Sequence, residues 1–320
     1  MKKKNLIQLA VLLLLGVGVL LSMAAFDFFP FRWVEKPLEI SVIIRESDSA
    51  GWASARQGME QAAGDLGVEL RFLTLSATNS TKEQRALLAR EVEGGASGVV
   101  LVPADPAALA SDVKEAAAHA VVVTMESDMR ESGASAYISV DNVALGHALG
   151  QAALNGVPEG GLAVLLNSSP GSSGVSDRLT EAARVLREAG REVRLCSEER
   201  GKTITQALAE ELQVEDPNAV LAFEPAALEL AARTAQSVGK QPLIYGAGAT
   251  GAIAAYLERN AITSIAAQNE FAAGYQAVEA AVHAARGETV PVAEAMEFSI
   301  IRQETIYNPD NQKLLFPVTR

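Results

Sequence analysis

Few residues of this 320-residue chain have the types and spacing of a catalytic or metal-binding group. The three histidines stand apart, and no His, Cys, Asp and Glu residues share the spacing of a zinc site. The tetrapeptide Gly-Ser-Ser-Gly at residues 171–174 lacks the G-x-S-x-G spacing of a hydrolase nucleophile. We therefore expect no metal, no cofactor and no enzymatic activity.

Two carboxylates, Glu126 and Glu224, are the nearest approach to an acid/base pair. Each comes just after an apolar run typical of a buried strand, so the two could face each other across a cleft as in glycoside hydrolysis. Nothing in the sequence raises the pKa of one against the other. The pattern favours ligand binding over catalysis.

The segment 139–154, SVDNVALGHALGQAAL, resembles a phosphate loop at first sight. A dinucleotide fingerprint needs glycines in the turn between strand and helix, whereas Gly146 and Gly150 lie inside the helical pattern. Asp141 or Asn142 can cap that helix, and the two glycines give it a smooth face for close packing. The segment is predicted to be a crossover between two domains.

The chain begins with Lys2, Lys3 and Lys4 and an apolar run at residues 5–26. This pattern is typical of a secretory signal, and the run is also long enough for a membrane anchor. Both alternatives place residues beyond 37 outside the cytoplasm, at the membrane or free in the cell envelope. The single cysteine, Cys196, excludes a lipid-bearing cysteine after the run, and the net charge of −12 argues against nucleic acid as a partner.

Short β-branched runs alternate with helical patterns, which predicts βα units and parallel sheets. The second half of the chain repeats the plan of the first, so we expect two α/β domains of one design. The predicted strands are residues 40–44, 68–75, 98–103 and 121–124, then 162–166, 193–195, 219–223 and 242–245.

At three places the sequence resembles the type I periplasmic solute-binding proteins, the ribose/galactose-binding group in particular. These places are the crossover VDNVALG, the first helix SAGWASARQGMEQAA, and the segment 264–282 with Gln268, Gly274 and Tyr275. Residues 298–318 look like the closing strands of that family. The resemblance covers nearly all of the chain beyond residue 37.

The resemblance implies two doubly wound parallel-sheet lobes joined by a three-crossover hinge, preceded by the N-terminal signal or membrane helix at residues 1–37. One lobe would hold residues 38–140 with 269–297, and the other residues 141–268 with 298–320. The hinge would contain Val140, Asp141, Asn142, Gln268 and Asn269. We expect a monomer.

In such a fold the ligand lies between the lobes, outside the carboxyl ends of the strands. Trp52 is the expected apolar platform, because a sugar ring can stack on an indole. The other candidate contacts are polar residues at predicted strand ends and at the hinge: Ser47, Asp48, Ser49, Glu126, Ser127, Ser168, Ser172, Ser176, Arg178, Glu224 and Gln268. Trp52 also fits a core position, and the serines also fit turns and helix caps.

The sequence departs from the sugar binders of the family, which grip hydroxyls with an Asp-Arg pair, a second arginine and a late aspartate. The matching places hold Glu126-Ser127, Ser176 and Gly248, unless Arg178 or Arg45 substitutes. The remaining groups are acidic and hydroxyl-rich, so an anionic ligand is disfavoured. A polyol, an unusual sugar or an amine-bearing solute is expected, in that order.

The resemblance implies a protein that captures a small solute and delivers it to an ABC-type permease. One alternative is an anchored sensor that partners a histidine kinase or a chemoreceptor. Another is a degenerate domain that binds partners and no solute.

Overall fold

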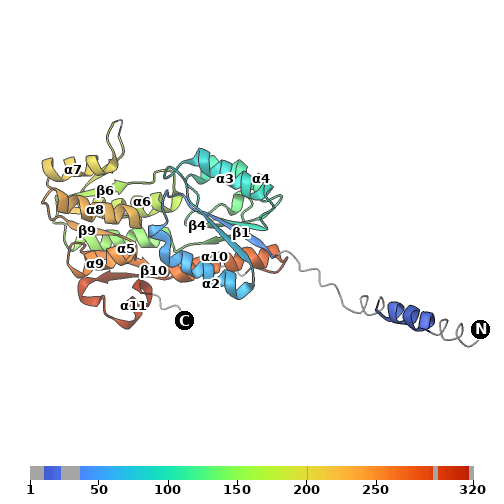
Figure 1. Ribbon diagram of the computed structural model, residues 1–320. Coiled ribbons are helices and arrows are strands. Elements are labelled where there is room, and N and C mark those ends of the chain that lie inside the picture. The colour runs from blue at the N-terminus through green and yellow to red at the C-terminus, as the bar shows by residue number, and fades with distance from the viewer. Residues whose placement is uncertain (1–10, 23–36, 200, 291–294, 317–320) are drawn as a thin grey trace, which may run out of the picture. The chain divides into compact units, whose positions relative to one another are not determined.

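The computed structural model describes residues 11–22, 37–199, 201–290 and 295–316. The chain divides into an N-terminal unit, residues 1–37, and a compact unit, residues 38–320 (Figure 1). In the N-terminal unit residues 11–22 are helical. None of the helices among the described residues has both the length and the hydropathy needed to cross a bilayer. The rest of the predicted membrane segment, residues 5–10 and 23–26, lies outside the described residues.

The compact unit has two lobes, each built on a sheet with helices on both faces, as predicted. The first sheet has the order β2-β1-β3-β4-β5 and is parallel throughout. Its strands and the helices between them are β1 (Glu39–Ile43), η1 (Ala50–Trp52), α2 (Ala53–Leu66), β2 (Glu69–Leu73), α3 (Thr81–Glu93), β3 (Gly98–Leu101), α4 (Pro106–Ala116), β4 (Val121–Met125), η2 (Arg130–Ser132) and β5 (Ala136–Ile138).

The second sheet has the order β11-β10-β9-β8-β6-β7, in which β11 alone of the described strands runs antiparallel to its neighbour. The elements of this part are α5 (Asn142–Leu154), β6 (Leu162–Asn167), α6 (Ser173–Glu188), β7 (Glu192–Ser197), α7 (Ile204–Val214), β8 (Ala219–Ala222), α8 (Pro225–Ser237), β9 (Leu243–Ala247), α9 (Gly251–Glu258), β10 (Ser264–Gln268), α10 (Glu270–Ala285), β11 (Phe298–Arg302), η3 (Gln303–Thr305) and α11 (Pro309–Leu315).

The central strands explain why apolar runs, and not alternating patterns, mark this fold. All residues of β1, β3 and β8 are buried, as expected for parallel strands that helices cover on both faces. The edge strands β2 and β7 are partly exposed and carry charged residues. In both lobes, therefore, the apolar layers packed on the two faces of the sheet fix the direction in which the carboxyl ends of the strands point.

Gly67 ends α2 in the left-handed region, with φ of 67°. The expectation that residues 298–318 form closing strands is wrong beyond β11, because η3 and α11 follow. Pro309 stands at the first turn of α11, where its missing N–H costs nothing.

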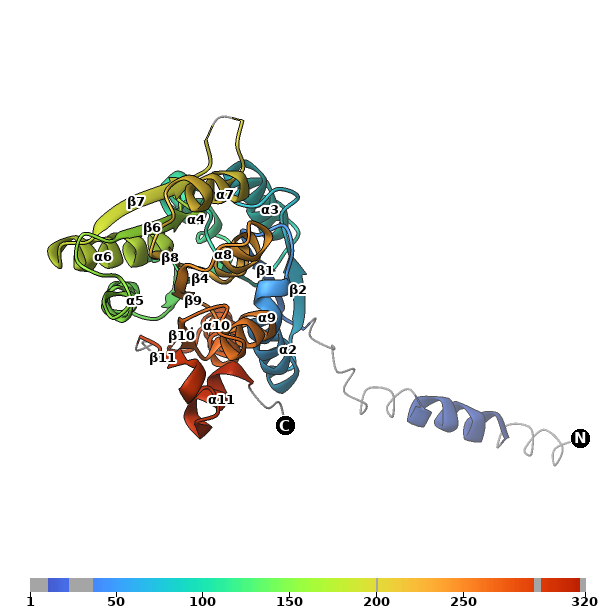
Figure 2. The same ribbon diagram turned by 90° about the vertical axis from the view of Figure 1, so that its left-hand side faces the viewer.

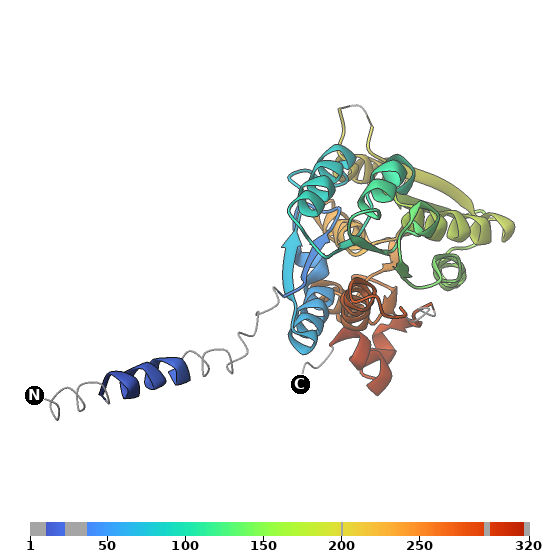
Figure 3. The ribbon, with the colours of Figure 1, turned by 90° about the vertical axis from the view of Figure 1, so that its right-hand side faces the viewer.

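The chain passes between the two sheets after β5, after β10 and after α10. Helix α10 returns to the first sheet and packs beside α2 (Figures 2 and 3). A backbone bridge joins Val140 to Met296, so two of these passages lie together. The predicted lobe boundaries, and the movement of the lobes as units about these passages, stay predictions.

Helices α2 and α10 approach each other through two glycines. A Cβ on Gly58 would lie 1.9 Å from the carbonyl oxygen of Phe271, and one on Gly274 would lie 1.9 Å from that of Ala55. Helix α5 uses the same device, since a Cβ on Gly146 would lie 2.3 Å from the carbonyl oxygen of Arg178. This confirms the smooth face predicted for the crossover helix.

We predict that Gly274→Ala lowers the free energy of unfolding by about 3 kcal/mol or more, because backbone atoms of α2 leave no space for a methyl group. Gly64→Ala on α2 is the matched control: nothing lies within 4 Å of its added Cβ, and alanine should stabilise that helix by about 0.5–1 kcal/mol. Chemical denaturation measures both. Equal stability of the two variants would contradict this account of the α2–α10 contact.

Candidate functional site

The carboxyl ends of β1 and β4 in the first lobe meet those of β6 and β8 in the second. A cavity of about 100 Å³ lies at this meeting point. Its lining combines charged groups with an indole and a proline: Arg45, Glu46, Asp48, Gly51, Trp52, Thr78, Glu126, Glu224, Pro225, Ala226 and Glu270. This is the place at which α/β folds bind ligands.

Arg45 is the central group of the cavity. It comes two residues after β1, and its side chain is only 1% exposed. The guanidinium donates to Glu126 on the first lobe and to Glu224 on the second, at 2.7 Å for the latter, and Glu46 lies 3.5 Å away. Burial alone would lower the pKa of Arg45, but these carboxylates outweigh it and raise the pKa well above its usual value.

Glu224 receives bonds from both lobes. It stands just before Pro225 at the start of α8, yet its side chain makes no capping bond and turns into the cleft. The Glu224 carboxylate accepts from Arg45 and from the hydroxyls of Ser168 and Ser169, the latter at 2.8 Å. One carboxylate therefore joins a strand end of the first lobe to two strand ends of the second.

Glu126 occupies the left-handed region, with φ of 62°, which is uncommon for a residue with a Cβ. Its carbonyl oxygen accepts from the hydroxyl of Tyr137 and from the Nδ2 of Asn142, both at 3.2 Å. Burial would raise the pKa of Glu126, but Arg45 and Arg178 together lower it. Glu126 thus stays ionised with its side chain directed at Arg45.

Glu46 and Glu270 are the two cavity carboxyls for which burial outweighs the nearby charges. Burial raises the pKa of each to about 7. One oxygen of Glu46 is buried without a hydrogen-bond partner, and Glu270 accepts from Gln268 at 2.9 Å. Near neutral pH the cavity therefore has two groups that can release or take up a proton.

Trp52 belongs to the core and also lines the cavity; that it forms a platform for a solute stays a prediction. Its side chain is 7% exposed and belongs to the apolar core of the first lobe with Ala55 and Met59. The same residue lines the cavity. A solute in the cleft would meet the face or edge of an indole held by the core behind it.

Of the predicted contacts, Asp48, Trp52, Glu126 and Glu224 line the cavity, and Ser168 bonds to Glu224. Whether any of them binds a solute stays a prediction. The others lie around the cavity or away from it. Ser47 is exposed and pairs with Thr78, Ser49 precedes η1, Ser127 and Ser172 approach each other at 3.4 Å across the lobes, and Ser176 bonds to the carbonyl oxygen of Pro170.

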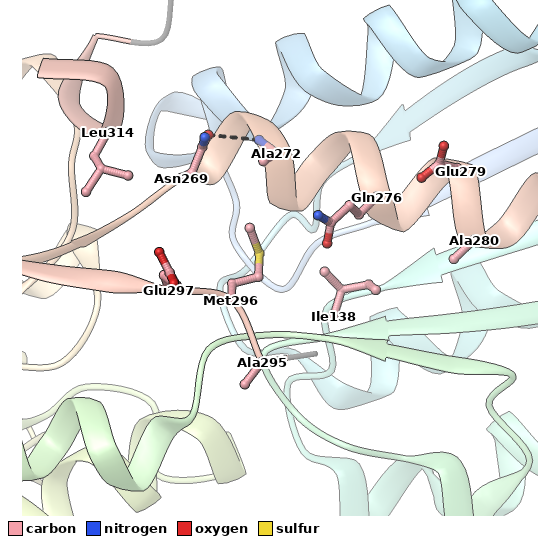
Figure 4. Close-up of a pocket in the computed structure, with 10 residues that line it drawn as sticks. All are labelled: Ile138, Asn269, Ala272, Gln276, Glu279, Ala280, Ala295, Met296, Glu297 and Leu314. Carbon is pink, nitrogen blue, oxygen red and sulfur yellow. Dashed lines mark hydrogen bonds between the residues drawn. The ribbon is translucent and has the colours of Figure 1, made fainter. Parts of the chain in front are cut away.

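Arg178 lies behind the cavity and not in it. The guanidinium is buried, donating to Asn142 Oδ1 at 2.7 Å and to the carbonyl oxygen of Phe223 at 2.9 Å. At the predicted hinge, Asp141 accepts from the backbone N–H of Ala144 and caps α5, as expected from the sequence. Asn269 caps α10 in the same way, through Ala272 (Figure 4).

Glu46, Thr78 and Glu270 are not among the predicted contacts, and Arg45 is expected only as a substitute for the arginines that the sugar binders use. The strand-end rule that selected Ser47 would have found Glu46 and Arg45 as well, since they stand one and two residues before it, directly after the β1 run. Glu270 follows the predicted hinge residue Asn269. Thr78 lies in the loop between β2 and α3 and carries no sequence signal.

A second cavity, of about 530 Å³, shares no residue with the first. It lies between α10 and the segment 295–297 at the third passage between the lobes (Figure 4). Its lining is mainly apolar, with Asn269, Gln276, Glu279 and Glu297 as polar groups. The described residues of its lining include no guanidinium and no aromatic ring, unlike those of the first cavity.

The sequence pattern of the periplasmic binding protein domain matches residues 40–289. The chain belongs to this family. It is a family of solute-binding proteins and not of enzymes, in agreement with the sequence analysis. No curated protein matches the chain in sequence.

Solved structures share the fold of this binding protein at low identity. A carbohydrate transporter solute-binding protein from Agrobacterium radiobacter in complex with D-arabinose has a TM-score of 0.78 and 18% identity, covering 88% of this chain and 99% of its own. The Caulobacter myo-inositol binding protein with myo-inositol has 0.74 and 19%, covering 86% and 97%. A chain of the XylFII-LytSN complex has 0.74 and 16%, covering 84% and 98%.

We predict that Glu270→Gln stabilises the binding protein at pH 8 and not at pH 4.5. Between its unfolded value of 4.5 and about 7, the folded protein holds a proton that the unfolded chain releases, so stability falls as pH rises through this window. The gain at pH 8 is on the order of 3 kcal/mol at most, from about 1.4 kcal/mol per pKa unit.

Thermal unfolding from pH 4.5 to 8 measures this effect. Glu69→Gln, an exposed carboxyl on β2, is the matched control and should show no such pH-dependent gain. A stability difference that is the same at both ends of the pH range would rule out burial of an ionised Glu270 as its cause.

Proposed function

We propose that this binding protein captures a small hydroxylated solute, a sugar or a polyol, between its lobes outside the cytoplasm and delivers it to an ABC-type permease. The observation that carries the proposal is the cavity at the strand ends of both lobes, with Trp52 beside carboxylates and a guanidinium. Solutes reported for proteins of similar fold, D-arabinose and myo-inositol, belong to the same chemical class.

The chemistry of the lining suits hydroxyl groups. Carboxylates such as Glu126, Glu224 and Glu270 accept hydrogen bonds from hydroxyls, and charge-assisted bonds of this kind are strong. The indole of Trp52 offers a surface for the C–H face of a sugar ring. Carboxyls outnumber guanidinium groups in the lining, so an anionic solute is disfavoured.

The size of the cavity implies that solute enters with the lobes apart. Pockets for small molecules measure roughly 300–1,000 Å³, well above the 100 Å³ found here. In this proposal the lobes, residues 38–140 with 269–297 and residues 141–268 with 298–320, rotate about the hinge to admit and enclose the solute. The apolar run at residues 5–26 directs export.

A thermal-shift screen of the full chain tests the proposal, with pentoses, hexoses, polyols, amino acids, polyamines and nucleosides. A solute at a hundred times its dissociation constant stabilises the protein by about 2.7 kcal/mol. We expect a sugar or polyol to raise the melting temperature.

The Kd of that solute, measured by calorimetry, should rise at least tenfold in Trp52→Leu and in Glu126→Gln, and stay unchanged in Glu69→Gln. No shift with any sugar or polyol would contradict the proposal.

The pH dependence of binding separates neutral from amine-bearing solutes. An ammonium group pairs with Glu46 and Glu270 once they lose their protons near pH 7, so its affinity should rise from pH 6 to pH 8. A neutral sugar or polyol lacks this charge and should gain no such affinity. Calorimetric titration at the two pH values, with Glu270→Gln as the variant in which the rise is reduced, measures the difference.

Sensing is the second candidate function, favoured by the similarity to XylFII, which has been solved in a complex with LytSN. In this case the closed binding protein would act on a membrane kinase or chemoreceptor. Reconstitution with proteins encoded beside it distinguishes the two. Stimulation of a permease ATPase supports transport, and altered autophosphorylation of a histidine kinase supports sensing.

A further inference from the structure

A buried ion pair joins the two lobes inside the cavity in which a solute is expected. Arg45 of the first lobe donates to Glu224 of the second at 2.7 Å, and both side chains are more than nine-tenths buried. Glu224 is held in place from its own lobe by Ser168 and Ser169. The guanidinium therefore reaches a prepared acceptor across the cleft.

The other polar contacts near the mouth of the cleft are longer or involve neutral groups. Asn79 donates to Ser169 Oγ at 3.0 Å, and Ser127 and Ser172 are 3.4 Å apart. A buried pair of opposite charges is stronger than either, provided both partners stay paired. Among the described cross-cleft bonds, Arg45–Glu224 is the one that pairs two buried charges.

Arg45 also donates to the carboxylates of the cavity in the way that a solute would. It places several N–H donors among Glu46, Glu126 and Glu224, where the hydroxyls or the ammonium group of a solute would donate. Its own Nε is buried and has no partner, so the guanidinium does not use all of its donors in this position. The Arg45 side chain is thus suited to the cavity, and a solute can still displace it.

We propose that Arg45 is an intramolecular occupant of the cleft: it ties Glu126 to Glu224 and holds the two lobes closed when no solute is present. The tie itself is independent of the proposed function. One consequence rests on that function, namely that a solute has to displace Arg45 from Glu224. Its apparent affinity is then reduced by the fraction of molecules in which the tie is closed.

Distance measurements between spin labels on the two lobes test the tie in the full chain without solute. The labels are placed at Lys82→Cys on α3 and Gln213→Cys on α7, both exposed, in a Cys196→Ser background. Figures 1 and 2 both show α3 and α7 on the side of the molecule opposite α11. Separation of the lobes should therefore lengthen the distance between the labels.

We expect a longer mean distance in Arg45→Met and in Glu224→Gln than in the parent protein, and no further lengthening in the double variant. Arg184→Met, which removes an exposed arginine paired with Glu181 and Glu188 on α6, is the matched control and should leave the distance unchanged. If Arg45→Met fails to fold, Glu224→Gln carries the test, because glutamine keeps the shape and can still accept from the serines. Parent-like distances in a folded Glu224→Gln would overturn the proposal.

Chemical rescue supplies a second readout. In Arg45→Ala, guanidinium ion at a low, non-denaturing concentration should bind between Glu126 and Glu224 and shorten the label distance toward the parent value. Sodium chloride at equal ionic strength should not. Equal responses to the two salts would contradict the tie. A solute screen without hits would remove the proposed function and leave this result untouched.

Discussion

The closed arrangement of this binding protein depends on a single buried guanidinium. Taking an arginine out of water is costly unless its charge is matched by well-placed carboxylates, and removing one partner of such a pair costs about 3–5 kcal/mol. Arg45 meets this condition only with the lobes together, since Glu126 and Glu224 lie on different lobes. The burial of Arg45, its pairing with carboxylates and the closure of the lobes therefore depend on one another. The strand ends, the serine hydroxyls and Glu224 at the start of α8 surround this guanidinium.

The cleft has more carboxyls than this guanidinium can balance. Glu46 and Glu270 remain, and their pKa values near 7 follow from burial without a full counter-charge. The protein does not fill this part of the cleft with a second cation of its own; Arg178 lies behind the cavity, bonded to Asn142 and Phe223. Because Glu46 and Glu270 lie in the same cavity as the indole of Trp52, we assign hydroxylated, non-anionic solutes to the cleft.

Much of this architecture could be predicted from the sequence, because parallel strands buried on both faces appear as apolar runs and their carboxyl ends define a common edge. The same rule brought Glu126 and Glu224 together from residues far apart in the chain. It could not reveal what occupies the space between them. A long side chain can point in several directions from a strand end, and only the position of the other lobe decides that Arg45 crosses the cleft. The pattern also could not show that α11 replaces a closing strand, since a short segment has too few residues to establish a period.

The left-handed backbone of Glu126 links the cavity to the predicted hinge. With φ of 62°, this residue directs its side chain forward to Arg45 and its carbonyl oxygen backward to Asn142, at the start of α5. Asn142 in turn accepts from Arg178, which donates to Phe223, the residue before Glu224. These bonds close a ring that crosses between the lobes twice, from Arg45 to Glu224 and from Asn142 to Glu126. In the proposed opening, the contact between Arg45 and Glu224 breaks while the one between Asn142 and Glu126 holds, so the proposal describes a rotation about Asn142 and not a parallel separation of the lobes.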